Sequence, residues 1–414
     1  MPSTHRSPLT RTPVRRTPIR RTGRAALVAA LLLTATACGS AAPAHGGADA
    51  ASASATAGGK PHLPGGLPSG LLDGLPKNWD DLKKWKLDDW DKWASQHVFH
   101  NPVVKNLWNA EKMKAAQAQD PTPPSAPAAP SPDSGGTGTG GSATATGSAG
   151  VTDPDPSPVQ AVPVPRPYTD NAASGKVFTS TASGDGTGQC SATVIADPAH
   201  PGKSNLVWTA GHCVHQGKGG DWYKNIIFVP AYNSSGAASQ GRHATLDQVA
   251  PLGEWWADRV VTSPQWMAEG GHSGGAANQY DFAVLRVHNP DGGGKSLEET
   301  VGSAVPVWFN APRDQLKVSA WGYPAVKPFD GQELDRCDGG TPVRLSYDAT
   351  RPPMLTIGCT MTAGASGGGW FAPMPDGRLA LVSDTSIGTA DHTSLSGPYL
   401  ETVAQQALAY LSQK

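Results

Sequence analysis

The sequence predicts that residues 166–414 form an all-β unit closed by a C-terminal helix. Short runs rich in β-branched and aromatic residues alternate there with turns rich in Gly, Asn, Asp and Pro. No helical period lies between these runs, which argues against alternating strands and helices. Within this unit, only its end has apolar side chains at helical spacing, namely Leu400, Val403, Ala404, Ala407, Leu408 and Leu411. A unit of this size fits a pair of small barrels or a large sandwich.

The apolar runs that define the predicted strands are short, and turn-forming residues separate them. Such lengths suit strands better than helices. The runs span residues 175–181, 190–196, 204–210, 225–231, 281–287, 315–321, 353–359 and 379–384.

Residues 1–37 have the three parts of a secretory signal peptide. A segment rich in arginine, from Arg6 to Arg24, precedes an apolar run from Ala25 to Leu33. Small residues, Ala35-Thr36-Ala37, follow as the cleavage end. The chain is therefore predicted to be exported, either secreted or anchored to the cell envelope.

Cys38 directly follows these small residues, as in a bacterial lipoprotein box. That box normally has Leu where this chain has Ala35, so simple secretion and a lipid anchor at Cys38 both stay open. Residues 38–75 are mostly Ala, Gly, Ser and Pro and are expected to form a flexible tether.

Two further segments precede the β unit. Residues 76–118 are rich in tryptophan and charge, and a helical wheel puts one apolar stripe together from Trp79, Leu82, Trp90 and Trp93. This segment is predicted to be an amphipathic helix that packs on the main domain or acts as a pro-segment. Residues 119–165, rich in Pro, Gly, Ser and Ala, are predicted to be a disordered linker.

Composition excludes some classes of function. The formal net charge of −1 argues against a nucleic-acid binder, because such proteins depend on neutralising phosphates. No apolar run is long enough for a transmembrane helix. With 49 Gly, 38 Pro and only 38% hydrophobic residues, a large part of the chain is not expected to be packed core.

The five cysteines fit an oxidising compartment. If Cys38 is removed or lipidated, four remain, and these allow two disulfides in three pairings. Pairing of neighbours in the sequence would join Cys190 with Cys213 and Cys337 with Cys359. The C-x-x-C and H-x-x-x-H spacings of zinc sites are absent, so no metal site and no cofactor are expected.

Three short stretches carry residues suited to nucleophilic catalysis. His212 follows a strand in VWTAGHCVH, Asp281 begins the apolar strand of QYDFAVLRV, and Ser366 lies in MTAGASGGGW. A serine hydroxyl needs a base to take its proton, and an imidazole does this near neutral pH. A carboxylate must orient the imidazole, and backbone N–H groups must stabilise the oxyanion. A second glycine-rich run, 272–277, lacks a strand-like lead-in and is interpreted as filler.

The motifs TAGHC, YDFAVL and GASGGG, in this order, resemble those of the chymotrypsin-like serine peptidases. AWGYPA at 320–325 is similar to the bacterial branch that includes the glutamyl endopeptidases. The resemblance covers about residues 176–409. It implies a fold of two six-stranded antiparallel β-barrels with a C-terminal helix, and it matches a Cys190–Cys213 pair flanking the histidine turn.

By this resemblance Ser366 is the nucleophile, His212 the general base and Asp281 its orienting carboxylate, while the N–H groups of Gly364 and Ser366 form the oxyanion hole. The trypsin branch has Asp before the nucleophile, where this chain has Ala365. In that branch the Asp pairs with a newly freed N-terminus on activation, so any latency here needs another device. We hypothesise that residues 76–118 lie over the active site and keep the peptidase inactive.

The resemblance also indicates which residues shape the substrate pocket. Thr360, six residues before the nucleophile, would lie at its base, and Ser383 would line its wall near the carboxylate of the triad. Both are small and neutral, so a preference for Lys or Arg before the cleaved bond is not supported.

The predicted function is a secreted serine endopeptidase that acts on proteins or peptides through an acyl-enzyme. Two alternatives stay open. One is a catalytically silent, trypsin-like binding module of the cell envelope. The other is an esterase of the α/β-hydrolase type, which Gly364-Ala365-Ser366-Gly367-Gly368 matches formally, but the order His, Asp, Ser and the absence of alternating helices argue against it.

Overall fold

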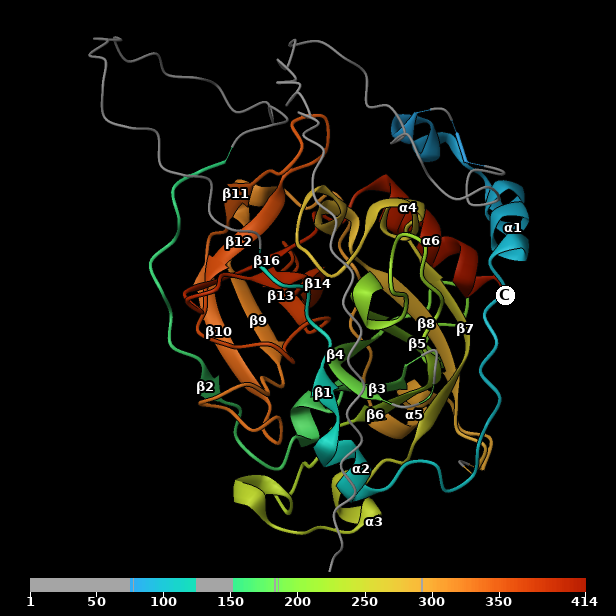
Figure 1. The fold of residues 1–414 in the computed structure, drawn as a ribbon, viewed down its shortest axis with the longest axis vertical. Coiled ribbons are helices and arrows are strands. Elements are labelled where there is room, and N and C mark those ends of the chain that lie inside the picture. Colours follow the sequence, from blue (N-terminus) through green and yellow to red (C-terminus); the bar gives the residue numbers. More distant parts are fainter. Residues whose placement is uncertain (1–74, 77, 124–151, 182–183, 185, 292) are drawn as a thin grey trace, which may run out of the picture. The chain divides into compact units, whose positions relative to one another are not determined.

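The computed structural model describes residues 75–76, 78–123, 152–181, 184, 186–291 and 293–414 (Figure 1). The predicted signal peptide 1–37, Cys38 and nearly all of the tether 38–75 lie outside this part of the chain. Among the described helices, none has the length and apolar character needed to cross a membrane.

Six strands form a closed antiparallel barrel in the order β4-β3-β6-β7-β8-β5, and pairing of β4 with β5 closes it. Closure leaves this sheet with no free edges among these strands. The strands are β3 (Ser174–Ser180), β4 (Thr187–Ile195), β5 (Leu206–Thr209), β6 (Lys224–Pro230), β7 (Trp255–Thr262) and β8 (Ala283–His288).

The second half of the β unit consists of two sheets, in the orders β14-β13-β9-β10-β2 and β11-β12-β16-β15. Side chains of both sheets share one core, among them Ala320 and Trp370 from the first and Leu355 and Ile357 from the second. The strands are β2 (Val162–Pro163), β9 (Val318–Gly322), β10 (Asp335–Gly340), β11 (Val343–Leu345), β12 (Met354–Gly358), β13 (Gly369–Pro373), β14 (Leu379–Asp384), β15 (Ile387–Gly388) and β16 (Ser394–Gly397).

These two halves confirm the predicted all-β, double-barrel fold. The six longest strands of the second half, β9, β10, β12, β13, β14 and β16, surround its core as two sheets rather than one continuous ladder. The predicted C-terminal helix is α6 (Thr402–Ser412). All the apolar residues that its spacing selected are buried.

Short helices connect and cover the strands. The α-helices are α1 (Leu87–Gln96), α2 (Ala110–Ala115), α3 (Leu246–Val249), α4 (Pro264–Glu269) and α5 (Leu297–Val301). The 3-10 helices are η1 (Trp79–Lys84), η2 (Thr169–Asn171), η3 (Gly211–Cys213), η4 (Ser239–Gly241), η5 (Ala276–Tyr280) and η6 (Arg313–Gln315).

The tryptophan-rich segment packs on α6, beside which α1 lies in Figure 1. Its predicted stripe is divided between η1 and α1, and its four residues are all buried in the core cluster that contains α6: Trp79, Leu82, Trp90 and Trp93. The ring of Trp90 stacks on Tyr410 of α6 with the ring centroids 6.2 Å apart. Apolar burial of these rings therefore holds residues 78–96 against the β unit.

The linker prediction for 119–165 is wrong at both ends. Residues 119–123 and 152–165 have defined partners. In the later stretch, β2 pairs with β10, and Asp153 accepts a hydrogen bond from the Arg344 guanidinium at 2.7 Å. The earlier stretch follows β1 (Gln117–Ala118) and includes Asp120, whose hydrogen bonds are described below. Composition reports which segments lack core-forming side chains. It does not report backbone hydrogen bonds, which any residue except proline can both donate and accept. The β unit therefore has partners upstream of its predicted boundary at residue 166.

We expect Trp90→Ala to lower the free energy of unfolding by about 3 kcal/mol or more, because it removes a fully buried indole and leaves a cavity. Urea denaturation followed by far-UV circular dichroism measures this, with the exposed Val98→Ala on the same segment as control. Equal midpoints for the two variants would contradict the packing of this segment as part of the fold.

Candidate active site

His212 lies in η3, the turn that joins β5 to β6. Strand β5 is fully buried and fixes the start of this turn. The disulfide between Cys190 of β4 and Cys213, which are 23 positions apart in the sequence, fixes its other side. The ring of His212 is only 4% exposed, so its orientation depends on its neighbours within the protein.

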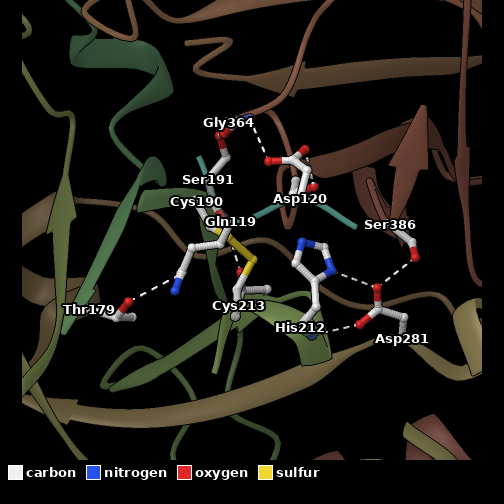
Figure 2. Close-up of a disulfide and its surroundings, with 12 residues drawn as sticks. Gln119, Asp120, Thr179, Cys190, Ser191, His212, Cys213, Asp281, Gly364 and Ser386 are labelled. Atoms are coloured by element: carbon white, nitrogen blue, oxygen red, sulfur yellow. Dashed lines mark hydrogen bonds and ion pairs between the residues drawn. A yellow bond between two sulfur atoms is a disulfide. The ribbon is translucent and has the colours of Figure 1, made fainter. Parts of the chain in front are cut away.

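Asp281 orients this imidazole. It follows η5 and precedes β8, and it is 0% exposed. Its Oδ1 accepts from the backbone N–H of His212 at 2.8 Å, and its Oδ2 is 2.7 Å from Nδ1 of the same residue. Figure 2 shows both contacts, together with the hydroxyl of Ser386, which donates to Oδ2 at 2.6 Å. The carboxylate thus favours the tautomer with the proton on Nδ1 and leaves Nε2 as the acceptor.

The pKa of His212 is raised above its ordinary value of 6.5. Burial acts in the opposite direction, because it disfavours the charged ring. The carboxylate of Asp281 outweighs burial through its charge and its hydrogen bond, and the charge of Asp120 adds to this effect. The Nε2 atom of His212 is buried and has no hydrogen-bond partner among the described residues.

Ser366 lies in a tight loop between β12 and β13. Gly364 has φ +99° and Gly367 has φ +75°, a region of backbone conformation that favours glycine. A Cβ on Gly367 would lie 2.0 Å from the hydroxyl oxygen of Thr209, so glycine is also required sterically. The carbonyl of Ser366 accepts from the N–H of Ser191 at 2.7 Å, which ties this loop to β4 of the first barrel.

The contacts of Ser366 and Gly364 involve a residue that the sequence did not single out. The carboxylate of Asp120 accepts from the N–H of Gly364 at 2.8 Å and from the hydroxyl of Ser366 at 2.6 Å. Figure 2 shows this carboxylate beside Gly364 and over the ring of His212. Ser366 is 0% exposed. Its N–H, the second expected oxyanion donor, makes no hydrogen bond to another described residue.

The two residues predicted to shape the substrate pocket, Thr360 and Ser383, each take part in a hydrogen bond with the backbone. The N–H of Ala161 donates to the Thr360 hydroxyl at 2.9 Å, and Ser383 is buried with its hydroxyl donating to the carbonyl of Pro398 at 2.8 Å. The hydroxyl that contacts the carboxylate of Asp281 belongs to Ser386, which the sequence did not single out. Counting along the LALVSD strand could not find it, because Ser386 comes after that strand has ended.

The four cysteines expected to pair do so as Cys190–Cys213 and Cys337–Cys359. Within the described residues, one His/Cys/carboxylate group has metal-like spacing, and it consists of Cys190, His212 and Cys213. Its two sulfur atoms are bonded to each other, so neither is a thiolate, which is the form that binds a metal.

A fold of two β halves, in which a buried carboxylate orients a histidine and a serine lies in a glycine-rich loop, is typical of serine peptidases. Comparison with protein-family models finds no match, and comparison with curated proteins finds none either. Among solved structures, the chain is similar to the thermostable serine protease AL20 from an extremophilic microorganism, at 36% identity and a TM-score of 0.47, over 59% of this chain and 99% of that one.

Two further structures are similar. The protease Anisep from Arthrobacter nicotinovorans has 31% identity and a TM-score of 0.47, over 59% of this chain and 96% of that one. A Glu endopeptidase has 17% identity and a TM-score of 0.44, over 64% of this chain and its whole length. From the identity over nearly all of the first two proteins, and from its own motifs, the chain belongs to the chymotrypsin-like serine peptidase family.

We expect Asp281→Asn to lower the pKa of His212, because the substitution removes the charge that favours the imidazolium. NMR titration of the ring in the Ser366→Ala chain measures this, with Asp376→Asn, an exposed carboxylate paired to Arg378, as control. Since the folded-state pKa is raised, the charged ring stabilises the fold below pH 6.5, and this contribution is lost as the pH rises through the folded pKa. An unchanged pKa in Asp281→Asn would contradict this account.

Proposed function

We propose that this chain is an exported serine endopeptidase in which Ser366 is the nucleophile, His212 the general base and Asp281 its orienting carboxylate. The observation that carries the proposal is the geometry of Asp281, which is fully buried and whose two carboxylate oxygens each form a hydrogen bond with His212. Burying a carboxylate is costly unless it is hydrogen-bonded. Two such bonds to one histidine are the arrangement that general-base catalysis needs.

The proposed reaction proceeds in two stages. The hydroxyl oxygen of Ser366 attacks the carbonyl carbon of a peptide bond, and its proton passes to Nε2 of His212. The N–H groups of Gly364 and Ser366 donate to the oxyanion that forms. When the C–N bond breaks, the leaving amine takes the proton from His212, and an acyl group stays on Ser366. Water then attacks this ester in the same way and releases the acid.

Ser386 is proposed as a positioning residue in this reaction. Its hydroxyl donates to Asp281, and it accepts from the side-chain amide of Asn278 at 2.9 Å. A donor held in this way fixes the orientation of the carboxylate.

Residues 1–37 are proposed to direct export, and Cys38 to be either removed or lipidated. Two disulfides within the β unit support an oxidising compartment. The substrates are proposed to be proteins or peptides, as for the serine proteases to which the chain is similar.

A silent binding module is the second candidate, and one observation favours it. Ser366 is covered and donates to Asp120 instead of a catalytic base. The same observation is compatible with a peptidase whose active site is occupied, and the two candidates differ in whether removing the cover permits hydrolysis.

We expect the full chain to cleave members of a mixed peptide library, either as it is or after Asp120→Ala, and Ser366→Ala to abolish cleavage in both backgrounds. Mass spectrometry of the products measures this and identifies the residue before each cut. Loss of a triad serine typically costs about 10⁶-fold in rate, so residual activity is below detection. No cleavage by either background, in protein shown to be folded and disulfide-bonded, would favour the binding module.

A further inference from the structure

We propose that residues 116–122 are a built-in inhibitor of this active site and that the Asp120 carboxylate is its inhibitory group. The inference rests on the proposed function, since it assigns a regulator to the same site. Its observation is the pair of hydrogen bonds that Asp120 accepts from Gly364 and Ser366.

The carboxylate engages one of the two N–H donors that the reaction requires for an oxyanion. The N–H of Gly364, one of the two expected oxyanion donors, is 2.8 Å from Oδ2 of Asp120. A group of donors arranged for a negative oxygen binds any anionic oxygen that reaches it, and charged acceptors make the stronger hydrogen bonds. Asp120 therefore matches the charge of the transition state without being a substrate.

Asp120 also withholds the nucleophile from its base. The hydroxyl of Ser366 has one proton, and that proton is directed to Oδ1 of Asp120 at 2.6 Å. Nε2 of His212, which would have to accept this proton, has no partner among the described residues. With the proton committed to a carboxylate, the hydroxyl is not activated for attack.

The segment is held on both sides of Asp120. Before it, β1 pairs in parallel with β4, with Gln117 opposite Gly188 and Ala118 opposite Gln189. After it, the N–H of Thr122 donates to the carbonyl of His272 at 2.7 Å, and its carbonyl accepts from Gly274 at 2.9 Å. The glycine-rich run 272–277, interpreted as filler from the sequence, thus supplies the backbone groups to which Thr122 binds.

A buried lysine fixes one of these anchors. Lys176 is fully buried, and its side-chain nitrogen donates to the Gln189 side-chain oxygen and to the carbonyl of Gly331. The amide oxygen of Gln189 thus faces Lys176. The amide nitrogen then points to the carbonyl of Ala116, to which it donates at 2.8 Å.

Packing upstream makes the contact intramolecular and persistent. The indole N–H of Trp108 donates to the carbonyl of Asn225 at 3.0 Å, and Asn101 bonds the backbone of Ile226 and Ala257. Together with the buried rings of residues 79–93, these contacts hold the chain in place up to Asp120. A tethered group has a high effective concentration, so one carboxylate suffices to occupy the site.

The segment resists cleavage because the wrong carbonyl group lies at the nucleophile. Attack requires a peptide carbonyl in the oxyanion hole, and here a side-chain carboxylate is hydrogen-bonded there. A carboxylate anion is a poor electrophile, and it has no leaving group. The occupant therefore behaves as an inhibitor that the enzyme does not hydrolyse.

The test compares Ser366 in full chains that carry either Asp120 or Asp120→Ala. In one arm, Cys38→Ser and Ser366→Cys are added, and alkylation of the new thiol by iodoacetamide is followed by mass spectrometry. In the other arm, Ser366 is retained and hydrolysis of the peptide library is measured. Asp88→Asn is the matched control, because Asp88 is an exposed carboxylate on the same segment, at the start of α1.

We expect Asp120→Ala to speed both alkylation and hydrolysis by about tenfold to a hundredfold, the range for losing hydrogen bonds to a charged group. Asp120→Asn, a near isostere, is expected to lie between, because its amide nitrogen cannot accept from Ser366. Equal hydrolysis by the Asp120 and Asp120→Ala chains would overturn the inference and leave the peptidase proposal standing. No hydrolysis by either chain, with faster alkylation in Asp120→Ala, would instead overturn the peptidase proposal.

Discussion

The active-site region depends on satisfying the buried carboxylate of Asp281. A carboxylate with no exposure needs hydrogen-bond donors, and it receives them from the backbone and ring of His212 and from Ser386. His212 belongs to the first barrel, while Ser386 follows β14 in the second half of the β unit. The same group therefore orients the histidine and links the two halves.

A second link between the halves fixes the serine loop. The hydroxyl of Ser191, on β4, donates to the carbonyl of Gly364 at 2.9 Å and accepts from the N–H of Tyr323 at 2.8 Å. Its N–H also donates to Ser366. One serine of the first barrel thus holds three points of the second half, and the conformation of Gly364 depends on it. These contacts hold the serine loop and its N–H groups in place, and oxyanion stabilisation requires such preorganised donors.

The parts of the fold that were predictable from sequence are those in which the apolar character of the side chains indicates that they are buried. Runs such as 204–210 and 353–359 have the β-branched composition of buried strands, and β5 and β12 lie within them. Strands β10, DRCDGG, and β13, GWFAP, were not predicted, because glycine and charge weaken the strand signal. Their pairing with β9, and the Cys337–Cys359 disulfide in β10, supply the stability that propensity does not.

The residues of the site also fall into those that could be predicted from the sequence and those that could not. His212, Asp281 and Ser366 lie in motifs with recognisable neighbours, and Cys190 and Cys213 follow from the same resemblance. Asp120 lies between glutamine and proline in a stretch whose composition indicates a linker. Nothing local marks it, since its role arises from a contact 246 positions along the chain. Ser386 was missed for a related reason, because the turn after β14 determines which serine reaches the carboxylate.

Position 365 explains why a carboxylate for latency has to come from a distant segment. In the trypsin branch an Asp stands directly before the nucleophile, but Ala365 is fully buried here. A Cβ built on Gly322 would lie 3.0 Å from the Cα of Ala365, so β9 and the serine loop are in close contact. A buried, charged side chain at 365 would have to separate these two segments and would need a partner of its own. Asp120 avoids both costs, because it approaches from outside the loop and finds its donors in the groups that the reaction itself provides.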